Sequence, residues 1–149
     1  MTDVEALTLA LDEARAGAAA GEVPVGAIVV ANGVVVGRGQ NRVLRDLDPT
    51  AHAEIVALRE AARALGNYRL SGCELFVTLE PCAMCAGAMI HARLSRLIYA
   101  AADPKAGAVS SVLEVLNHPR LNHQMAVTSG ELAEESAELL RSFFRERRT

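Results

Sequence analysis

Two short motifs in this chain carry the residue types that bind zinc: His52-Ala53-Glu54, and a second motif at residues 81–85 with the sequence PCAMC. One imidazole and two thiolates make three ligands, one fewer than the four that close a structural zinc site. A water molecule can occupy the open position, and the metal lowers the pKa of that water to roughly 7. Glu54 can move protons to and from this water. The motifs predict a hydrolytic centre whose zinc ligands are His52, Cys82 and Cys85.

The spacing of these residues requires that both motifs lie where helices begin. Cys82 and Cys85 are three residues apart, so their thiols share one face of a helix. Pro81 suits the first turn of that helix, where a missing N–H is tolerated. His52 and Glu54 are two residues apart and converge only at a helix N-terminus. We therefore expect the site between two helix starts.

Hydrophobic periodicity predicts the elements that position these motifs. Helices are expected from a capping box at Thr2 to Gly21, and at residues 51–65 (N-cap Thr50), 81–93 and 109–116. A last helix is expected to carry an apolar stripe from Leu132 to Phe144 and to have a basic end. Strands are expected at residues 25–30, 34–37, 75–79, 97–101 and 125–128, with an Asn32-Gly33 hairpin turn joining the first two. This alternation predicts an α/β fold in which helices cover a mixed, five-stranded sheet.

Composition and length narrow the class of protein. The chain has 149 residues, enough for one domain and too few for two, so we expect residues 1–149 to form a single domain. Half of the residues are hydrophobic and only 3% are aromatic, so Ala, Val, Leu and Ile must build the core. The net charge of −3 argues against sequence-blind binding of nucleic acid, but it allows a local basic patch.

The sequence also predicts the compartment. Acidic residues interrupt the first segment, so it does not read as a secretion signal. No apolar run approaches the ~18 residues of a membrane span. Three cysteines, two of them in the zinc motif, do not make a disulfide framework. We expect a cytoplasmic protein that has no membrane partner.

The Cys-x-x-Cys motif alone allows other interpretations. It could be a redox pair, half of a zinc ribbon, or two buried thiols. A zinc ribbon lacks its second pair here, because Cys73 is the only other cysteine. A redox pair would leave the His-Ala-Glu motif unexplained. The two motifs together therefore favour a catalytic zinc site.

The same motifs resemble a known superfamily. His-Ala-Glu followed by Pro-Cys-x-x-Cys resembles the cytidine deaminase-like zinc hydrolases, whose fold is a three-layer α/β/α sandwich. Longer strings narrow the resemblance to the bacterial tRNA-specific adenosine deaminases: VPVGA at 23–27, Asn41-Arg42, DPTAHAE at 48–54, TLEPCAMCAGA at 78–88, Asp103-Pro104-Lys105 and FFR at 143–145. The resemblance covers nearly the whole chain and implies one cytidine/deoxycytidylate deaminase-like domain.

The resemblance implies a reaction and a partner. One zinc ion per subunit would activate a water that attacks C6 of adenine, with Glu54 carrying the protons, so that adenosine at wobble position 34 of a tRNA anticodon becomes inosine. The expected partners are a tRNA anticodon stem-loop, rather than DNA, and a second copy of the chain in a homodimer. The residues expected to bind substrate are Asn41, the backbone of Ala53 and Pro81, and Asp103, the last beside a ribose 2′-hydroxyl.

Several of these residues have a structural alternative. Asn41 could order its own loop, and Asp103 before Pro104 is a common start of a turn. Phe143 and Phe144 lie on an apolar helical stripe, with one of them available for base stacking. The basic end of the last helix could contact RNA or could be a solvated helix end: Arg141, Arg145, Arg147 and Arg148. The residues expected to be structural are Cys73, His91, His118 and His123.

Two other functions share the zinc motifs. A deaminase of free guanine, cytosine or a nucleoside would need neither the 103–105 motif nor a basic C-terminal helix. A binding module that keeps zinc for structure alone would need no carboxylate at Glu54. These features favour an RNA substrate and catalysis.

Overall fold

The computed structural model describes residues 1–147, and its centre is a five-stranded sheet. The strands lie in the order β2-β1-β3-β4-β5, with the bounds β1 Gly26–Ala31, β2 Val34–Gln40, β3 Glu74–Leu79, β4 Arg96–Ala101 and β5 Ala126–Ser129. β1 runs antiparallel to both β2 and β3, whereas β3, β4 and β5 are parallel. The mixed five-stranded sheet predicted from the sequence is confirmed.

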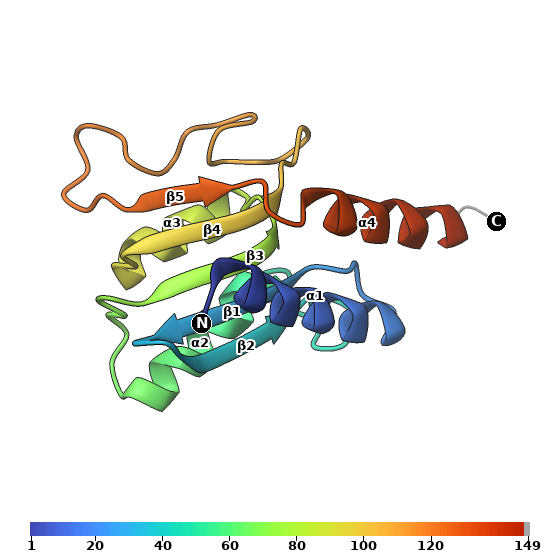
Figure 1. Ribbon diagram of the computed structural model, residues 1–149, viewed down its shortest axis with the longest axis horizontal. Helices are drawn as coiled ribbons and strands as arrows, with labels where there is room; N and C mark the ends of the chain where they lie inside the picture. The colour runs from blue at the N-terminus through green and yellow to red at the C-terminus, as the bar shows by residue number, and fades with distance from the viewer. Residues whose placement is uncertain (148–149) are drawn as a thin grey trace.

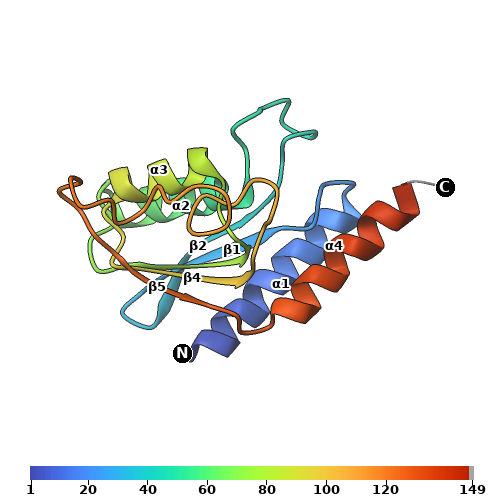
Figure 2. The same ribbon diagram turned by 90° about the horizontal axis from the view of Figure 1, so that it is seen from above.

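In the described part of the chain, four helices cover the two faces of this sheet: α1 Asp3–Ala19, α2 Ala53–Leu65, α3 Ala83–Ala92 and α4 Ala133–Arg147. α1 and α4 lie side by side on one face, and α2 and α3 lie on the other (Figures 1 and 2). This arrangement confirms the three-layer α/β/α architecture. Within residues 1–147, no helix is long and apolar enough to cross a membrane.

The capping box, the hairpin turn and the glycine stop predicted from the sequence have the backbone geometry that such motifs require. Thr2 and Glu5 form a reciprocal capping box that begins α1. Asn32 and Gly33 both have positive φ, at 51° and 76°, as a two-residue hairpin turn of type I′ requires. Gly66 ends α2 in the left-handed conformation, with φ at 67°. These turns and caps fix where the neighbouring elements begin and end.

The core has one hydrophobic cluster on each side of the sheet. Alternate side chains of a strand point to opposite faces, so Leu75 and Val77 pack toward α2 and α3, whereas Phe76 packs toward α1. Met89 of α3 is fully buried in the first cluster, and Ile28 is fully buried in the second. Both faces of the central strands are covered, which explains their nearly continuous apolar sequences.

Two glycines of β2 allow α2 to lie directly against the strand. A Cβ at Gly39 would collide with the carbonyl oxygen of Ala53, and a Cβ at Gly37 would collide with that of Ala57. The missing side chains therefore permit an approach that no other residue allows. This contact holds the first turns of α2, and with them the His-Ala-Glu motif, against the sheet.

The helix predicted at residues 109–116 is wrong. This segment consists of turns and bends between β4 and β5. The adjoining prediction for the last helix needs a smaller correction, since Leu132 has a φ of 59° and precedes α4. After residue 108 the backbone N–H groups of Val112, Leu113 and Val115 bond to carbonyl oxygens five to seven residues back rather than four, so no helix forms at residues 109–116.

Candidate active site

The His-Ala-Glu motif begins α2, but the predicted N-cap is wrong: the N-cap is His52, with φ −71° and ψ 155°, and not Thr50. The backbone N–H and the hydroxyl of Thr50 both donate to Oδ1 of Asp48, at 2.9 and 2.7 Å, so this side chain is engaged in a local turn. The first N–H of the helix, that of Ala53, instead donates to Oδ1 of Asn41 at 2.9 Å. A side chain twelve residues earlier therefore caps α2.

The cysteine motif begins α3 in a similar way. Cys82 is the N-cap, with extended backbone, and Cys85 lies in the first turn. Pro81 precedes the cap, so its predicted place in the first helical turn is wrong. β3 ends at Leu79, which puts both thiols just beyond the carboxyl end of a central parallel strand, a common place for ligand sites in α/β folds.

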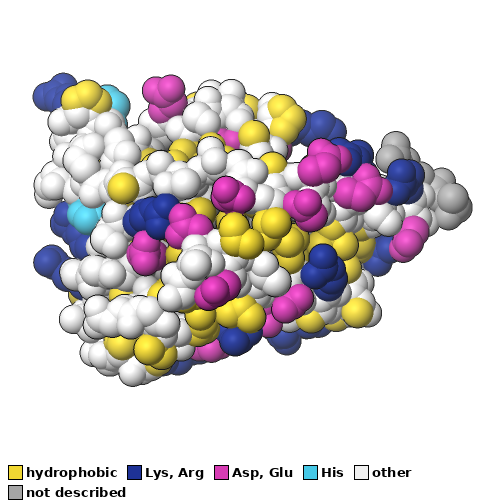
Figure 3. Space-filling model, viewed as in Figure 1, with side chains coloured by type: hydrophobic (Ala, Val, Ile, Leu, Met, Phe, Trp, Pro, Cys, Tyr) yellow, Lys and Arg dark blue, Asp and Glu magenta, His cyan; other side chains and the backbone are white. Residues whose placement is uncertain are grey.

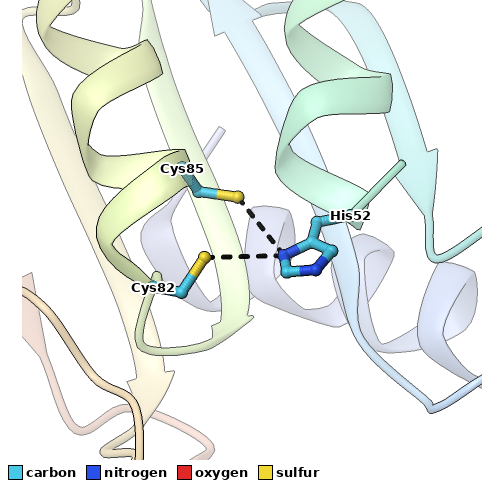
Figure 4. A group of neighbouring side chains, drawn as sticks. All are labelled: His52, Cys82 and Cys85. Atoms are coloured by element: carbon cyan, nitrogen blue, oxygen red, sulfur yellow. Dashed lines mark hydrogen bonds between the residues drawn. The ribbon is translucent and has the colours of Figure 1, made fainter. Parts of the chain in front are cut away.

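The two helix starts bring the three expected ligands together (Figure 4). Nδ1 of His52 lies 3.5 Å from Sγ of Cys82 and 3.6 Å from Sγ of Cys85. The three ligand atoms all lie within 4.8 Å of one another. Standard Zn–N and Zn–S bonds at a tetrahedral angle would place such nitrogen and sulfur atoms about 3.5 Å apart. The donor set and its spacing therefore fit zinc, with Nδ1 as the ligating nitrogen.

The electrostatics of this cluster also suit a cation. Hydrogen bonds with Cys85 and His52 lower the pKa of Cys82 to about 3. The bond with Cys82, together with burial, raises the pKa of Cys85 well above that of a free thiol. Without a cation the pair therefore keeps one proton. A divalent ion between the two sulfurs would stabilise both thiolates.

Glu54 is buried beside this cluster, with 4% of its surface exposed. Burial raises the pKa of its carboxyl to about 7, which is the range in which a carboxyl group both accepts and donates protons at neutral pH. Together with His52 and Cys82 it lines a cavity of about 400 Å³. The lining of this one cavity thus includes two potential metal ligands and a group that can carry protons.

Asn41 and Asp103 also line this cavity, whereas Ala53 and Pro81 are buried behind its surface. The N–H of Ala53 is bonded to Asn41, and the carbonyl oxygen of Pro81 accepts the N–H of Ala108 at 2.8 Å. A carbonyl oxygen has a second lone pair, so Pro81 retains one acceptor position. Contacts between these four residues and a substrate remain predictions.

Asn41 and Asp103 also hold backbone in place. The amide of Asn41 donates to the carbonyl oxygen of Val23 at 3.0 Å while its oxygen caps α2. Oδ1 of Asp103 accepts the N–H groups of Lys105 and Ala106, as in a turn that starts with Asp. The structural alternatives considered for both residues are therefore present, on side chains that also face the cavity.

Sequence reasoning missed Glu80, a buried carboxylate between β3 and Pro81. It accepts the backbone N–H groups of four residues and the hydroxyl of one of them: Asp103, Val109, Ser110 and Ser111. Burial raises the pKa of Glu80, but these hydrogen bonds lower it to about 2, so the group is ionised.

Three successive N–H groups at one carboxylate would also suit the first turn of a helix. The next N–H groups do not continue a helix, because Val112 and Leu113 donate to the carbonyl oxygen of Gly107 and Val115 donates to that of Ala108. These acceptors lie five to seven residues back rather than four, so the segment closes into an irregular loop.

The loop closes tightly around Glu80, because a Cβ at Gly107 would collide with its carboxyl group. We expect Glu80→Gln to lower the free energy of unfolding by about 2–3 kcal/mol, since hydrogen bonds to a charged group are lost in a buried place. Denaturant unfolding at pH 7 measures the change. Glu114→Gln, on an exposed side chain of the same loop, is the control. If Glu80→Gln unfolded with the same free energy as the parent protein, Glu80 would not stabilise this loop as described.

Comparisons with known proteins identify the family. A model of the MafB19-like deaminases matches residues 1–148. The tRNA-specific adenosine deaminase of Agrobacterium fabrum is 51% identical over 95% of this chain and 93% of its own length. That of Haemophilus influenzae is 46% identical over 98% of this chain and 85% of its own. The chain belongs to the tRNA-specific adenosine deaminase family.

Solved structures agree with this family membership. One chain, from a study of A-to-I editing by tRNA:A34 deaminases at the wobble position of transfer RNA, is 48% identical with a TM-score of 0.88. That match covers 91% of this chain and 99% of the other. A guanine deaminase from Nitrosomonas europaea is 30% identical with a TM-score of 0.80, over 94% of this chain and 83% of the other. The fold of the family is thus shared with a deaminase of a free base.

The remaining residues singled out in the sequence lie away from the ligands. Within residues 1–147, the group formed by His52 and the two motif cysteines is the one His/Cys/Asp/Glu cluster with metal-binding spacing. Nε2 of His123 lies 2.6 Å from the carbonyl oxygen of Leu94, which supports a structural role. Cys73 is buried, and burial raises the pKa of its thiol. These observations agree with the structural roles expected for both residues.

Of the two neighbouring aromatic residues of α4, one is buried and one is partly exposed, as predicted. Phe143 is buried with 8% of its surface exposed, whereas Phe144 is 46% exposed. The arginines nearby have partners on their own helix: Arg141 and Arg145 pair with Glu138, and the guanidinium of Arg147 lies 3.7 Å from the ring centre of Phe143. Arg148 lies outside the described residues.

Proposed function

We propose that this protein is a zinc-dependent hydrolase that converts adenosine to inosine at wobble position 34 of tRNA anticodons. The observation that carries the proposal is the cavity where Glu54 lies beside His52, Cys82 and Cys85. The relatives named above add the substrate class, since those most similar to this chain act on tRNA by name.

In this proposal His52, Cys82 and Cys85 hold one zinc ion. When bound, the zinc supplies a water molecule that is acidic enough to react near neutral pH. Glu54 would accept one proton from the attacking water and pass it to a ring nitrogen of the adenine while the water oxygen bonds to C6. It would then move the remaining proton of that oxygen to the amino nitrogen, so that the C6–N bond breaks and ammonia leaves. Its burial suits this task, because a carboxyl group with a pKa near 7 can serve in both directions.

The substrate contacts proposed from the family resemblance lie around the same cavity. Asn41 would bind the flipped nucleotide through the part of its amide that does not bond to the protein. Backbone atoms at Ala53 and Pro81 would lie along the reacting edge of the base. Asp103, at the boundary of the cavity, would meet the ribose of a neighbouring nucleotide, where a 2′-hydroxyl distinguishes RNA from DNA.

A second groove supports a polymeric substrate over a free base. It has a volume of about 760 Å³ and shares three lining residues with the catalytic cavity: Val23, Leu79 and Asp103. Its lining also includes Lys105, Arg141 and Phe144, whose side chain is half-exposed. A free base needs only the first cavity, whereas nucleotides beside a flipped base need such a continuation with cations and a ring for stacking.

The charge of the groove is modest for an RNA-binding surface. Acidic and basic side chains lie next to one another on the surface over α4 (Figure 3), and Arg141 is 2.9 Å from Glu138. We infer that the enzyme acts as a homodimer, in which a second subunit adds contacts to the anticodon arm. We further propose that residues 1–149 form one domain and that the protein works in the cytoplasm, where tRNA is available.

The test is to incubate the purified, zinc-loaded protein with an anticodon stem-loop that carries A34. Parallel reactions contain free guanine, cytosine, adenine or adenosine. We expect inosine in the stem-loop and no ammonia from the free compounds. Ammonia from guanine alone would favour a free-base deaminase, which the guanine deaminase fold makes a specific alternative. No product in any reaction would favour a binding module.

A further inference from the structure

Glu22 is a buried carboxylate on the segment between α1 and β1, and its surface is 1% exposed. Its two oxygens accept the backbone N–H groups of Leu44 and Arg45, at 3.1 and 2.9 Å. The side chain of Arg45 also donates through Nε to Glu22, at 3.1 Å. Burial raises the pKa of Glu22, but these hydrogen bonds outweigh it and hold the pKa below its usual value. An ionised group thus anchors the loop that follows β2.

The same loop is fixed from a second direction. The guanidinium of Arg45 donates to Oε1 of Gln40 at 2.8 Å and to the carbonyl oxygen of Asn41 at 2.6 Å. Asn41 in turn bonds to Val23, the residue after Glu22. The loop is therefore held at two points. The side chain of Glu22 binds residues 44 and 45, and the backbone carbonyl of Val23 binds Asn41.

The loop that Glu22 anchors borders the candidate active site. Glu22, Asn41 and Leu44 all line the catalytic cavity, and Leu44 is 66% exposed at its edge. Because so little of Leu44 is buried, packing does little to fix its position, and the bond from its N–H to Glu22 holds the backbone there in place. The loop is thus fixed in a shape that presents one amide and one apolar side chain to whatever enters the cavity.

We propose that Glu22 is a positioning residue for substrate binding: it holds residues 41–45 so that Asn41 and Leu44 meet the nucleotide. This inference rests on the function proposed above.

The proposal predicts a division of effects, because the catalytic groups have supports that do not involve the carboxylate of Glu22. The helix α2, which has His52 as its N-cap and carries Glu54, packs against β2, and its cap by Asn41 is held by the bond from Asn41 to Val23. Cys82 and Cys85 lie at the start of α3. Loss of the anchor should weaken binding and leave the chemical step in place.

The experiment compares three full-length, zinc-loaded variants on the A34 stem-loop. Glu22→Gln neutralises the anchor, and Arg45→Ala removes the guanidinium but keeps both backbone bonds. Asp3→Asn is the matched control, because Asp3 forms a similar carboxylate–guanidinium pair with Arg96, at 2.6 Å, that shares no residue with the cavity. Steady-state kinetics give KM and kcat separately.

For Glu22→Gln we expect KM to rise at least roughly tenfold while kcat stays within about threefold, since weakened bonds to a charged group act on binding alone. Arg45→Ala should raise KM by a smaller factor, and Asp3→Asn should change neither constant. A KM for Glu22→Gln equal to that of Asp3→Asn would overturn the proposal, as would a fall in kcat at constant KM.

Amide hydrogen exchange without substrate separates this inference from the proposed function. In Glu22→Gln, the amides of Leu44 and Arg45 should exchange at least roughly tenfold faster than in the parent, because their acceptor is weakened. Unchanged exchange would overturn the anchor whatever the activity. A parent protein that fails to deaminate the stem-loop would instead contradict the proposed function.

Discussion

Replacing Glu54 with Gln should reduce kcat for inosine formation by roughly a thousandfold or more, the upper part of the range for losing a general acid–base group. Gln keeps the size of the side chain but cannot carry a proton, so the variant should still fold and bind one zinc ion per chain. Kinetics on the stem-loop and metal analysis of the same sample measure both properties. Glu54→Ala should behave alike.

The control for this variant is Glu114→Gln, which neutralises an exposed carboxylate far along the chain from the motif and should retain full activity. Substantial activity in Glu54→Gln would remove Glu54 from its proposed role. Loss of zinc from Glu54→Gln would show instead that the carboxylate supports the metal site, and would equally contradict a role limited to proton transfer.

Replacing Cys82 with Ala should remove the zinc and destabilise the fold together. Metal that binds only the native state contributes to its stability, by about 4 kcal/mol when free zinc is a thousand times its dissociation constant. We therefore expect Cys82→Ala to contain less than about a tenth of the parent's zinc and to lose at least ~3 kcal/mol of unfolding free energy. Chemical unfolding and elemental analysis provide the two measurements.

The matched control is Cys73→Ala, because Cys73 is a buried thiol that takes no part in the cluster. It should keep its zinc and lose only the small packing contribution of one sulfur atom. If Cys82→Ala were folded, active and free of metal, the proposed ligand set would be refuted. A loss of zinc in Cys73→Ala but not in Cys82→Ala would have the same consequence.

The predictions that succeeded depend on local chemistry. The apolar runs of the strands, the capping box at Thr2 and the Asn32-Gly33 turn are each specified by a few neighbouring residues, so they can be read from the sequence alone. The metal cluster was predictable for a different reason. His52 and Cys82 are thirty residues apart, but each stands at a helix start, and helix starts in an α/β sheet meet at the same edge.

The predictions that failed concern bonds between distant segments. Thr50 is a residue type that is common at N-caps, but its hydroxyl donates to Asp48 instead. The first N–H of the helix is bonded to the side chain of Asn41, which comes from another loop. In the segment predicted as a helix at 109–116, residues 109–111 bond to Glu80, about thirty residues earlier in the chain, and later N–H groups return to Gly107 and Ala108 out of helical register. A buried carboxylate that binds backbone N–H groups so far away leaves no periodic signal, and the same is true of Glu22.

A weaker signal for these carboxylates does exist in the sequence. Glu22 and Glu80 each stand between an apolar segment and a proline motif, at Val23-Pro24 and at Pro81. A charged residue in such a place is exposed or is paired by several donors. Sequence cannot distinguish these outcomes, because the donors come from loops whose paths are unknown until the sheet is assembled.

The central claim is that three side chains hold one zinc ion and leave a position open for water. X-ray absorption spectroscopy of the purified, active protein, with zinc measured on the same sample, tests it most directly. We expect one zinc per chain, bound by two sulfur atoms, one imidazole nitrogen and one further light atom that exchangeable water supplies. Active protein without zinc, or zinc enclosed by four side chains, would contradict the account.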